Sequence, residues 1–300
     1  MLSICIPIYM QNVTKLVTDL ELQMEKLEVP CELILIDDCS SDLYKRQNEA
    51  ACSKHKYYKL EKNIGRSKIR NLFLQYAQYK YLLFLDCDAE VIDDSFLRNY
   101  IPYLLESEYS VICGSSIYQK EKPNRNKRLR WKNGRIRETI SPEVRMKRPH
   151  SSFMTSNVII KKSIFDIITF DENLTKYGHE DTLFGYALMK QNISILHIYN
   201  PVLNADLDTN KVFVNKMEYA LDNLVIILKS INFAPEFIQN NKLLSLYFKL
   251  KSKHIIPFVC FLFFFVKQII RFLLTNGVAS LFILDIYKFG VLANAFQKNK

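Results

Sequence analysis

The sequence predicts an α/β protein: a Rossmann-like, mostly parallel sheet with flanking helices, followed by C-terminal amphipathic helices. Short apolar runs typical of buried strands alternate with segments of helical periodicity through the first half of the chain, and this alternation is typical of parallel sheets. The 300 residues, of which 49% are hydrophobic, are enough for one large α/β domain with an appendage. We therefore expect a globular domain over residues 1–235 and a basic, apolar helical tail over residues 236–300.

Each expected element rests on its own periodicity. The helices carry apolar residues at i, i+3 and i+4, as in Ile69, Leu72 and Phe73, whereas the strands are nearly continuous apolar runs. Strands are expected at residues 2–9, 32–37, 57–60, 81–86, 109–116 and 193–198. Helices are expected at residues 13–27, between the second and third strands, around 69–76 and 94–105, from about 178, and over 210–229.

The net charge of +10 is concentrated in two segments. Residues 119–150 contain twelve Lys or Arg against three Glu, and residues 236–300 contain nine against Glu236 and Asp285. The first segment shows no clean period, so we expect a long loop with short strands at most. Both segments suit anionic partners. Nucleic acid is not expected, because single-strand binders interleave aromatic residues for base stacking and the first segment offers only Trp131.

The cysteines and the N-terminus predict a cytoplasmic location. The seven cysteines show no C-x-x-C pairing with His, which argues against a disulfide framework and against a zinc site. The first residues, MLSICIPIY, lack a basic stretch and include Pro7, so they are typical of a strand rather than a signal peptide. We expect the protein to stay in the cytoplasm unless another segment anchors it.

The most informative stretch is residues 81–90, in which a buried strand leads directly into Asp86 and Asp88. Side chains two residues apart on an extended segment project from the same side, so the two carboxylates can share one divalent cation while Cys87 points away. Mg2+ and Mn2+ take carboxylate oxygens together with substrate phosphates. A strand that ends in a polar turn is the alternative, because a lone D-x-D is weak evidence.

Two further polar groups follow a predicted strand or begin a predicted helix. Asp37 and Asp38 end the second strand, where a carboxylate can accept from a base or ribose, although the same residues suit a turn and an N-cap. Residues 63–71, NIGRSKIRN, place three cations in the first two turns of a helix. Cations there oppose the helix dipole, so a bound diphosphate would compensate them. A solvated basic face is the alternative.

A pair of carboxylates, Glu180 and Asp181, begins another helix directly after Gly178 and His179. Acidic residues in a first turn ordinarily complement the helix dipole. Here an apolar face over residues 183–188 fixes the helix against the sheet. A carboxylate held so rigidly can act as a positioned base.

Together these motifs resemble the family 2 nucleotide-sugar glycosyltransferases, which have the GT-A fold and invert. The order IPIY, LIDDCSSD, NIGRSKIRN, FLDCD, FMTSN, FDE and YGHEDTLFG carries the resemblance over about residues 1–230. It implies transfer of a sugar from a nucleoside-diphosphate sugar to a hydroxyl, with a divalent cation, Mn2+ or Mg2+, as cofactor. Asp86 and Asp88 would hold this cation and the donor. Asp181 would be the catalytic base, with Glu180 as its neighbour or substitute.

The resemblance also implies residues around both substrates. The expected donor-binding residues are Pro7, Tyr9, Asp37, Asp38, Asn63, Gly65, Arg66, Arg70 and Asp86. The expected acceptor-binding residues are Asn157, Gly178, His179 and Trp131. One departure is Asn204, which stands where related chains often carry a His, and His197 lies too early in its strand to replace it. Because Asn is a poorer metal ligand, a noncatalytic or partner-dependent homologue is the alternative.

The tail predicts an anionic membrane surface as a partner. Residues 255–266 form an uncharged run of twelve, whereas a spanning helix needs about 20 apolar residues, and extending the run includes Lys267 and Arg271. The i, i+4 spacing of these cations is typical of an interfacial helix among anionic lipids. Packing onto the globular domain or a second subunit is the alternative. We expect a peripheral enzyme on the inner face of the plasma membrane, acting on a lipid-linked or surface-glycan acceptor.

Overall fold

The computed structural model describes the chain except for residues 107, 176, 299 and 300. It divides into two compact units. Unit 1 comprises residues 1–119, 138–175 and 180–206, and unit 2 comprises residues 120–137, 176–179 and 207–300. The expected functional boundary between residues 235 and 236 remains a prediction.

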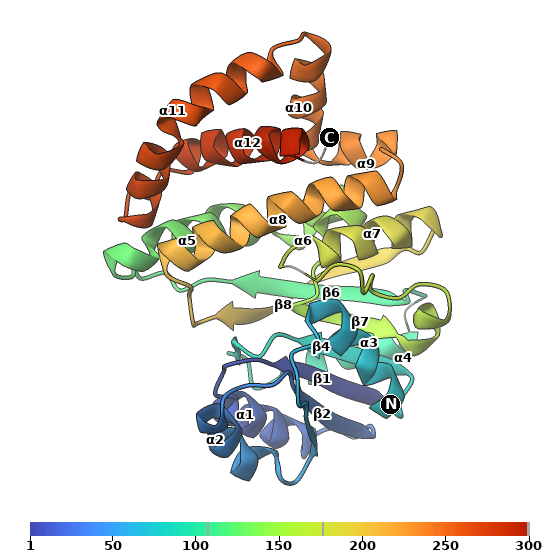
Figure 1. The fold of residues 1–300 in the computed structure, drawn as a ribbon. Helices are drawn as coiled ribbons and strands as arrows, with labels where there is room; N and C mark the ends of the chain where they lie inside the picture. The colour runs from blue at the N-terminus through green and yellow to red at the C-terminus, as the bar shows by residue number, and fades with distance from the viewer. Residues whose placement is uncertain (107, 176, 299–300) are drawn as a thin grey trace. The chain divides into compact units, whose positions relative to one another are not determined.

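Unit 1 contains an eight-stranded sheet in the order β3-β2-β1-β4-β7-β6-β8-β5 (Figure 1). The strands are β1 (Leu2–Ile8), β2 (Cys31–Asp37), β3 (Lys56–Lys59), β4 (Tyr81–Leu85), β5 (Ala89–Val91), β6 (Val111–Ile117), β7 (Asn157–Lys161) and β8 (Ile195–Asn204). Pairing is parallel from β3 through to β4 and between β6 and β8, whereas β7 runs antiparallel to β4 and β6, and β5 to β8. This sheet, mostly parallel and flanked by helices, confirms the predicted fold class.

The helices of unit 1 follow the predicted alternation with strands. They are α1 (Thr14–Met24), α2 (Asp42–Cys52), α3 (Arg66–Tyr76), α4 (Ile101–Glu106), α6 (Pro142–Met146) and α7 (Glu180–Lys190). The helix expected around 94–105 is the least regular, because Asp93 accepts from the Ser95 N–H at 2.8 Å and from the Asn99 side chain at 3.0 Å. These bonds favour a turn there, so the regular helix begins only at Ile101.

The basic segment 119–150 is largely helical, so the prediction of a loop with short strands is wrong. It contains α5 (Arg128–Asn133), a π-helical turn at Gly134–Glu138, and α6. α5 and α6 have only six and five residues. Helices this short bury one or two side chains each, which leaves no repeat for periodicity to detect.

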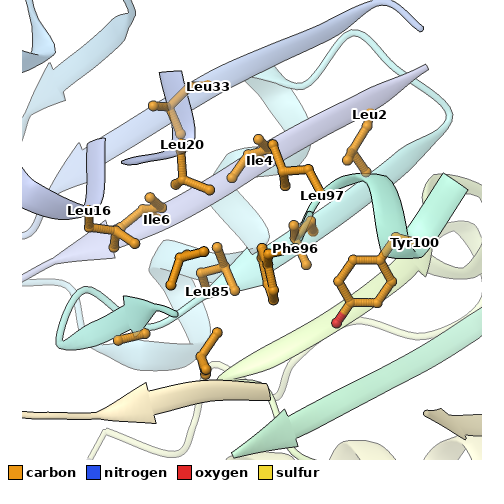
Figure 2. Close-up of a cluster of buried hydrophobic side chains, with 14 of the residues drawn as sticks. Leu2, Ile4, Ile6, Leu16, Leu20, Leu33, Leu85, Phe96, Leu97 and Tyr100 are labelled. Carbon is orange, nitrogen blue, oxygen red and sulfur yellow. The ribbon is translucent and has the colours of Figure 1, made fainter. Parts of the chain in front are cut away.

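Apolar side chains cover both faces of the sheet. On one face Leu2 and Ile4 of β1 pack with Leu20 of α1 (Figure 2), and on the other Cys5 of β1 packs with Phe73 of α3. Successive residues of a strand point to opposite faces, so the nearly continuous apolar runs of β1 and β4 serve two layers of helices.

Arg145 of α6 is buried and closes an irregularity between β6 and β8. The register of these strands shifts between Cys113 and Ser115. The guanidinium donates to Ser115 Oγ at 2.8 Å, to the Ile198 carbonyl at 3.0 Å and to the Gly114 carbonyl. Carbonyls that the irregular pairing leaves without a strand partner are thereby satisfied. Arg145 therefore supports the sheet and does not belong with the exposed cations of its segment.

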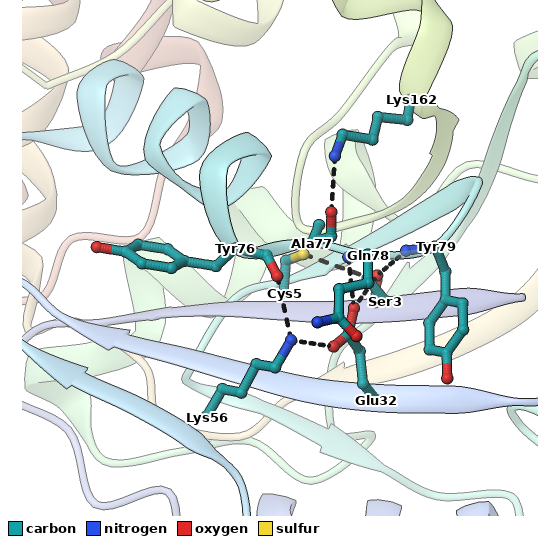
Figure 3. Close-up of polar contacts among 9 residues, drawn as sticks. All are labelled: Ser3, Cys5, Glu32, Lys56, Tyr76, Ala77, Gln78, Tyr79 and Lys162. Carbon is teal, nitrogen blue, oxygen red and sulfur yellow. Dashed lines mark hydrogen bonds and ion pairs between the residues drawn. The ribbon is translucent and has the colours of Figure 1, made fainter.

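Glu32, in β2, joins the amino ends of neighbouring strands. Ser3 Oγ donates to Glu32 at 2.6 Å, Lys56 Nζ donates at 2.7 Å and the backbone N–H of Gln78 donates at 2.7 Å (Figure 3). Burial alone would raise the pKa of Glu32, but these hydrogen bonds hold it below its ordinary value. Contacts within the protein therefore satisfy this end of the sheet.

Unit 2 is helical in the part of the chain that the structure describes. Besides α5 it contains α8 (Asn210–Ser230), α9 (Pro235–Asn240), α10 (Lys242–Ser252), α11 (Ile256–Thr275) and α12 (Leu281–Lys298). The Thr209 hydroxyl caps α8, and the Asn241 side chain caps α10. Gly290 of α12 faces Phe263 of α11, where an added Cβ would come within 2.3 Å of the ring. The two helices therefore pack closely.

Candidate active site

Three sequence motifs meet where β1, β2 and β4 end. These strands are parallel neighbours, so their carboxyl ends lie side by side. The chain leaves the three strands at Tyr9, Asp38 and Asp86. In open α/β sheets the ligand crevice lies outside this edge. The sheet therefore brings the predicted donor-binding motifs together.

Asp37 and Asp38 both shape the loops at this edge. Asp37 is completely buried, its Oδ1 accepts from the Ser40 N–H at 2.6 Å, and its Oδ2 has no hydrogen-bond partner among the described residues. The Asp38 carboxylate accepts from the N–H groups of Ile64 at 2.6 Å and Gly65 at 3.1 Å. Burial raises the pKa of Asp38, and these two backbone donors partly offset the rise.

The loop before α3 depends on Gly65. Its φ of 85° lies in the left-handed region, and an added Cβ would meet nothing within 4 Å. Conformation and not space therefore favours glycine here. Asn63 donates to the Asp38 carbonyl at 3.2 Å, which ties the same loop to the end of β2.

Two arginines on one face of α3 connect the acidic motifs. Arg66 Nη1 lies 3.0 Å from Glu180 Oε1, and Arg70 Nη2 lies 3.0 Å from Asp86 Oδ1. Arg70 is buried, whereas the side chain of Arg66 is 44% exposed. The sequence suggested that a bound diphosphate compensates the cations of this helix. In the structure two carboxylates of the protein already compensate Arg66 and Arg70.

The adjacent carboxylates Glu180 and Asp181 have opposite electrostatic environments. Burial would raise the pKa of Glu180, but Arg66 and Arg70 hold it below its ordinary value. Burial and the neighbouring charge of Glu180 raise the pKa of Asp181 to about 6. Two carboxylates whose environments push their pKa values apart are typical of acid–base sites.

The D-x-D motif lies in a turn between β4 and β5, not on an extended strand. The Ala89 N–H donates to the Asp86 carbonyl at 3.1 Å, which closes the turn. Asp86 reaches Arg70, whereas Cys87 packs against the core cluster that contains β1 and α1, so the two side chains point to different sides. The expectation of an extended backbone at Asp86–Asp88 was therefore wrong, because the turn begins at Asp86.

The two carboxylates suit a hard cation by ligand type. In the described part of the chain no three His, Cys, Asp or Glu side chains gather into a metal-binding cluster. A cation held by Asp86 and Asp88 would complete its coordination with substrate phosphates and water, as Mg2+ does in nucleotide sites.

Asn204 lies next to this turn. In the antiparallel pairing of β5 with β8, Asn204 is opposite Ala89, the residue after Asp88. Its amide nitrogen donates to Ser116 Oγ and, at 3.5 Å, to the Ile117 carbonyl. The structure thus places Asn204 where a residue could complement the D-x-D motif.

His197 is unsuited to that task. It is 3% exposed, its Nε2 lies 2.9 Å from the Pro149 carbonyl, and its Nδ1 lies 3.1 Å from Arg145. Burial, the positive charge of Arg145 and that of a protonated His150 lower the pKa of His197 to about 4, although the Pro149 carbonyl opposes this. His197 is therefore a neutral residue of the sheet.

The remaining predicted residues fall into three groups. Tyr9 is 52% exposed directly after β1, whereas Pro7 lies within it. Asn157 is completely buried and its amide bonds Tyr100, the Ser115 carbonyl and the Asn200 carbonyl, so it acts in the sheet in this conformation. Gly178, His179 and Trp131 belong to unit 2.

Gly178 and His179 form a strained approach to α7. Their φ angles are 101° and 68°. A Cβ on Gly178 would come within 2.5 Å of Ala220 Cβ, and Asn223 donates to the Gly178 carbonyl at 3.0 Å. Glycine is therefore needed at position 178 for both conformation and space. The acceptor-binding roles of Asn157, Gly178, His179 and Trp131 remain predictions.

Sequence reasoning missed the structural links between the motifs. It did not pair Arg66 with Glu180 or Arg70 with Asp86, residues separated by 114 and 16 positions. It also missed Arg145. Opposite charges in separate motifs were the available signal, but only the fold determines which charges meet.

The fold and the site define a class: an α/β protein with acidic motifs at the carboxyl ends of its strands. The family model for Glycosyl transferase family 2 matches residues 3–168, more than half of the chain. The chain therefore belongs to glycosyl transferase family 2. This confirms the resemblance that the sequence motifs carried.

Individual relatives are distant. Chondroitin synthase from Escherichia coli is 26% identical over 222 residues, which cover 63% of this chain but only 32% of that protein. The chain thus spans about a third of the length of this curated relative. Among solved structures, residues 1–349 of TarS from S. aureus in complex with UDP match with a TM-score of 0.51 and 19% identity, covering 100% of this chain and 92% of that chain.

A second solved structure extends the likeness of fold. The mannosyltransferase PcManGT from Pyrobaculum calidifontis, in complex with GDP-Man and Mn2+, matches with a TM-score of 0.55 and 12% identity, covering 99% of this chain and 74% of that chain. At these identities the likeness shows the fold alone.

Proposed function

We propose that the chain transfers a sugar from a nucleoside-diphosphate sugar to a hydroxyl of an acceptor, with inversion at the anomeric carbon. The observation that carries the proposal is the difference in environment between the adjacent carboxylates Glu180 and Asp181. Arg66 pairs with Glu180, whereas the pKa of Asp181 is raised to about 6. A base with a pKa near the working pH combines adequate ionisation with useful proton affinity.

The reaction is a single displacement. The acceptor oxygen forms a bond to the anomeric carbon from one face while the bond to the diphosphate breaks on the other, and the electron pair leaves with the diphosphate. Asp181 takes the proton of the acceptor hydroxyl. Glu180 is the positioning neighbour, because its ion pair with Arg66 holds the first turn of α7 beside α3.

The donor would bind at the carboxyl ends of β1, β2 and β4. Tyr9 and the loop that Asp38 anchors would border the base and ribose, and Arg66 would reach the diphosphate. A divalent cation, Mn2+ or Mg2+, held by Asp86 and Asp88 would neutralise charge on the leaving diphosphate. UDP and GDP-Man with Mn2+ in the two structural neighbours support this donor class and this cofactor.

The acceptor is a lipid-linked or surface glycan, reached from the cytoplasmic side of the membrane. The support is the apolar character of α11, whose mean hydropathy is 2.0 and whose outer side chains are exposed. The relative named chondroitin synthase supports a polysaccharide acceptor.

The test is turnover of candidate nucleotide sugars by the full chain with and without Mn2+. Hydrolysis or transfer that requires Mn2+ and is abolished by Asp181→Asn would support the proposal. Binding of UDP without any turnover would instead identify a noncatalytic homologue.

A further inference from the structure

The outer surface of α11 presents a row of exposed apolar side chains. Phe258, Phe261, Phe265, Ile269 and Phe272 are each between 60% and 66% exposed. Their spacings of three and four residues place them on one face of the helix. Fourteen residues of helix span about 21 Å. Monomeric soluble proteins rarely leave so long an aromatic surface uncovered.

This apolar face carries no charge. Lys267 and Arg271 lie three or four residues from buried side chains of the same helix. This spacing places both cations on the opposite, packed face, which includes Cys260, Phe263 and Leu274. Arg271 Nε lies 3.2 Å from Glu218 Oε1, and Arg271 Nη2 lies 2.5 Å from Asn215 Oδ1, both in α8. The expectation that this pair faces lipid is therefore wrong for Arg271.

The basic segment 120–137 packs against the turn that joins α11 to α12. The Arg125 side chain lies where a Cβ on Gly277 would be, and Lys132 Nζ donates to the Ala279 carbonyl at 3.0 Å. Arg137 forms two bonds to Asp285, of 2.7 and 2.6 Å. Segment and helices thus form one structural element, as Figure 1 shows for α5, α8 and the two helices.

The same segment is also fixed to α8. Asn210 accepts from the Leu129 N–H at 3.0 Å and donates to the Arg125 carbonyl at 3.0 Å. The Arg130 guanidinium lies 5.4 Å from the centre of the Phe213 ring. The segment therefore has contacts at both ends that do not require a substrate.

Segment 120–137 contains nine Lys or Arg and one acidic residue, Glu121, which gives it a net charge of +8. Lys120, Lys122 and Arg135 are exposed. Arg137 donates to the Leu281 carbonyl, and the next residue, Phe282, is exposed. Cations beside exposed aromatic residues are typical of proteins that bind anionic lipid surfaces.

We propose that the apolar face of α11 and segment 120–137 together form a single membrane-binding surface for bilayers that contain anionic lipids. The aromatic side chains enter the headgroup and acyl boundary, and the exposed Lys120, Lys122 and Arg135 contact lipid phosphates. The segment serves this surface rather than the donor. A second copy of the chain is a poorer occupant, because its own segment would bring a further +8 to the same surface.

This inference deepens the proposed function by assigning the partner of unit 2, and it rests on the proposed function only for the location of the acceptor. The test is flotation of the full chain with vesicles of phosphatidylcholine alone or mixed with phosphatidylglycerol. Lys120→Glu with Lys122→Glu should weaken binding to the mixed vesicles at least about tenfold and leave binding to the neutral ones unchanged. Phe261→Ser with Phe265→Ser should weaken binding to both by at least about tenfold.

Matched controls lie in unit 1. Lys26→Glu with Lys54→Glu reverses two exposed cations there, and Leu43→Ser with Leu105→Ser removes two exposed leucines. Neither pair should change flotation by more than about twofold, because both lie outside the proposed surface. Binding of the wild-type chain to mixed vesicles should also fall as salt rises, which needs no variant.

The outcomes separate this inference from the proposed function. Each variant is also titrated with UDP and Mn2+ in solution, where affinity should stay at the wild-type value. Flotation without UDP binding would leave the membrane surface standing and count against the proposed function. The inference would be overturned if the lysine variant floated as well as the wild-type chain. It would also be overturned if the wild-type chain formed an oligomer that does not float, and the phenylalanine variant did not form that oligomer.

Discussion

The two ends of the strands in unit 1 both carry charged networks, but only one network is complete. At the amino end Glu32 accepts from Ser3, Lys56 and the Gln78 N–H, and these bonds join three strands and the chain that leads into a fourth. At the carboxyl end Asp37 Oδ2, Ser67 Oγ and Arg70 Nε are buried without a hydrogen-bond partner among the described residues.

The difference shows what each end is for. An unpartnered buried polar atom costs about 1–3 kcal/mol, so a fold selected for stability alone would satisfy it. The amino end does so with a carboxylate and a lysine. The carboxyl end instead leaves buried polar atoms without a partner among the described residues, in the part of unit 1 that carries Asp86, Asp88 and Asp181, where the proposed donor binds. Changes at the carboxyl end should therefore affect ligands and turnover, whereas changes at the amino end should affect stability.

The largest expected effect is that of Asp181→Asn. Turnover should fall at least about 100-fold, the usual cost of losing a general base, while affinity for UDP with Mn2+ stays near the wild-type value. The measurement is steady-state turnover together with calorimetric titration. Glu180→Gln is the matched neighbour. If that variant is inactive and Asp181→Asn retains most activity, the two roles must be exchanged.

The pH dependence follows from the same carboxylate. The pKa of Asp181 is raised from 3.8 to about 6, and a base must be ionised, so turnover should fall as the pH drops below about 6. The raised pKa also means that ionising Asp181 opposes folding. Its contribution favours folding at low pH and is lost as the pH rises from 3.8 to about 6. The Asn variant should lose this part of the pH dependence of unfolding. Wild-type turnover that is as fast at pH 4 as at neutral pH would contradict the assignment of Asp181 as the base.

Next comes Asp88→Asn. Removing one carboxylate of the D-x-D turn should weaken binding of UDP in the presence of Mn2+ by about tenfold or more, because loss of even indirect ligand support costs 10–100-fold in metal affinity. Titration of UDP with and without Mn2+ measures it.

Asp86→Asn is the informative companion. Asp86 pairs with the buried Arg70, so this change should lower thermal stability as well as affinity. For Asp88→Asn, an affinity for UDP with Mn2+ equal to that of the wild type would show that Asp88 is not a metal ligand.

The strands and helices around the carboxyl ends of the sheet were easier to predict from the sequence than the rest of the molecule, because their burial patterns are regular. Strand and helix periodicity is set by burial on one or both faces, and it correctly predicted β1, β2, β4 and α3 of unit 1 and α8 of unit 2. The basic segment failed, because α5 and α6 are too short to show a period and are fixed by single buried residues such as Leu129 and Arg145. Charge alone could not tell the buried Arg145 from the exposed cations around it.

The candidate site shows the same limit. Residue types and spacing predicted Asp86, Asp88, Glu180 and Asp181 as site residues, because these carboxylates stand near a strand end or a helix start, and their roles remain predictions. Pairing is a matter of tertiary structure: the sequence did not show that Arg66 faces Glu180 or that Asn204 faces Ala89. The amino-end network around Glu32 was not predicted either, since Glu, Lys and Ser at strand starts carry no motif.

At the amino end, Glu32→Gln should destabilise the protein by about 2 kcal/mol, the usual value for hydrogen bonds to a charged group. Affinity for UDP should not change. Because the pKa of Glu32 is lowered from 4.5, its contribution is present above that pH and is lost as the pH falls through the lower value in the folded protein. Urea unfolding at neutral pH and at pH 3 would show a smaller difference between wild type and variant at pH 3.

The control for Glu32 is Glu49→Gln, which removes an exposed partner of Lys59. The side chains of that pair are 60% and 37% exposed, so its loss should cost less than about 0.5 kcal/mol. A Glu32 variant that is as stable as this control would mean that the amino-end network contributes no more than a surface ion pair.

The smallest expected effect concerns Asn204→His. Asn204 is opposite Ala89 in the sheet, and its amide nitrogen donates to the Ile117 carbonyl, so its Oδ1 is the atom left to meet a cation at the D-x-D turn. An imidazole there should tighten binding of Mn2+ with UDP by about three- to tenfold, with a smaller gain for Mg2+, because Mg2+ prefers oxygen and imidazole suits softer ions.

Two other substitutions at position 204 make that prediction decisive. Asn204→Asp adds a carboxylate and should tighten binding of both cations, whereas Asn204→Ala should weaken both. If His, Asp and Ala all leave the apparent affinities for Mn2+ and Mg2+ unchanged, Asn204 only fastens β8 to β6 through Ser116 and Ile117. In that case the carboxyl end would bind its cation with Asp86, Asp88 and the donor phosphates, and the incomplete network there would serve the donor rather than the metal.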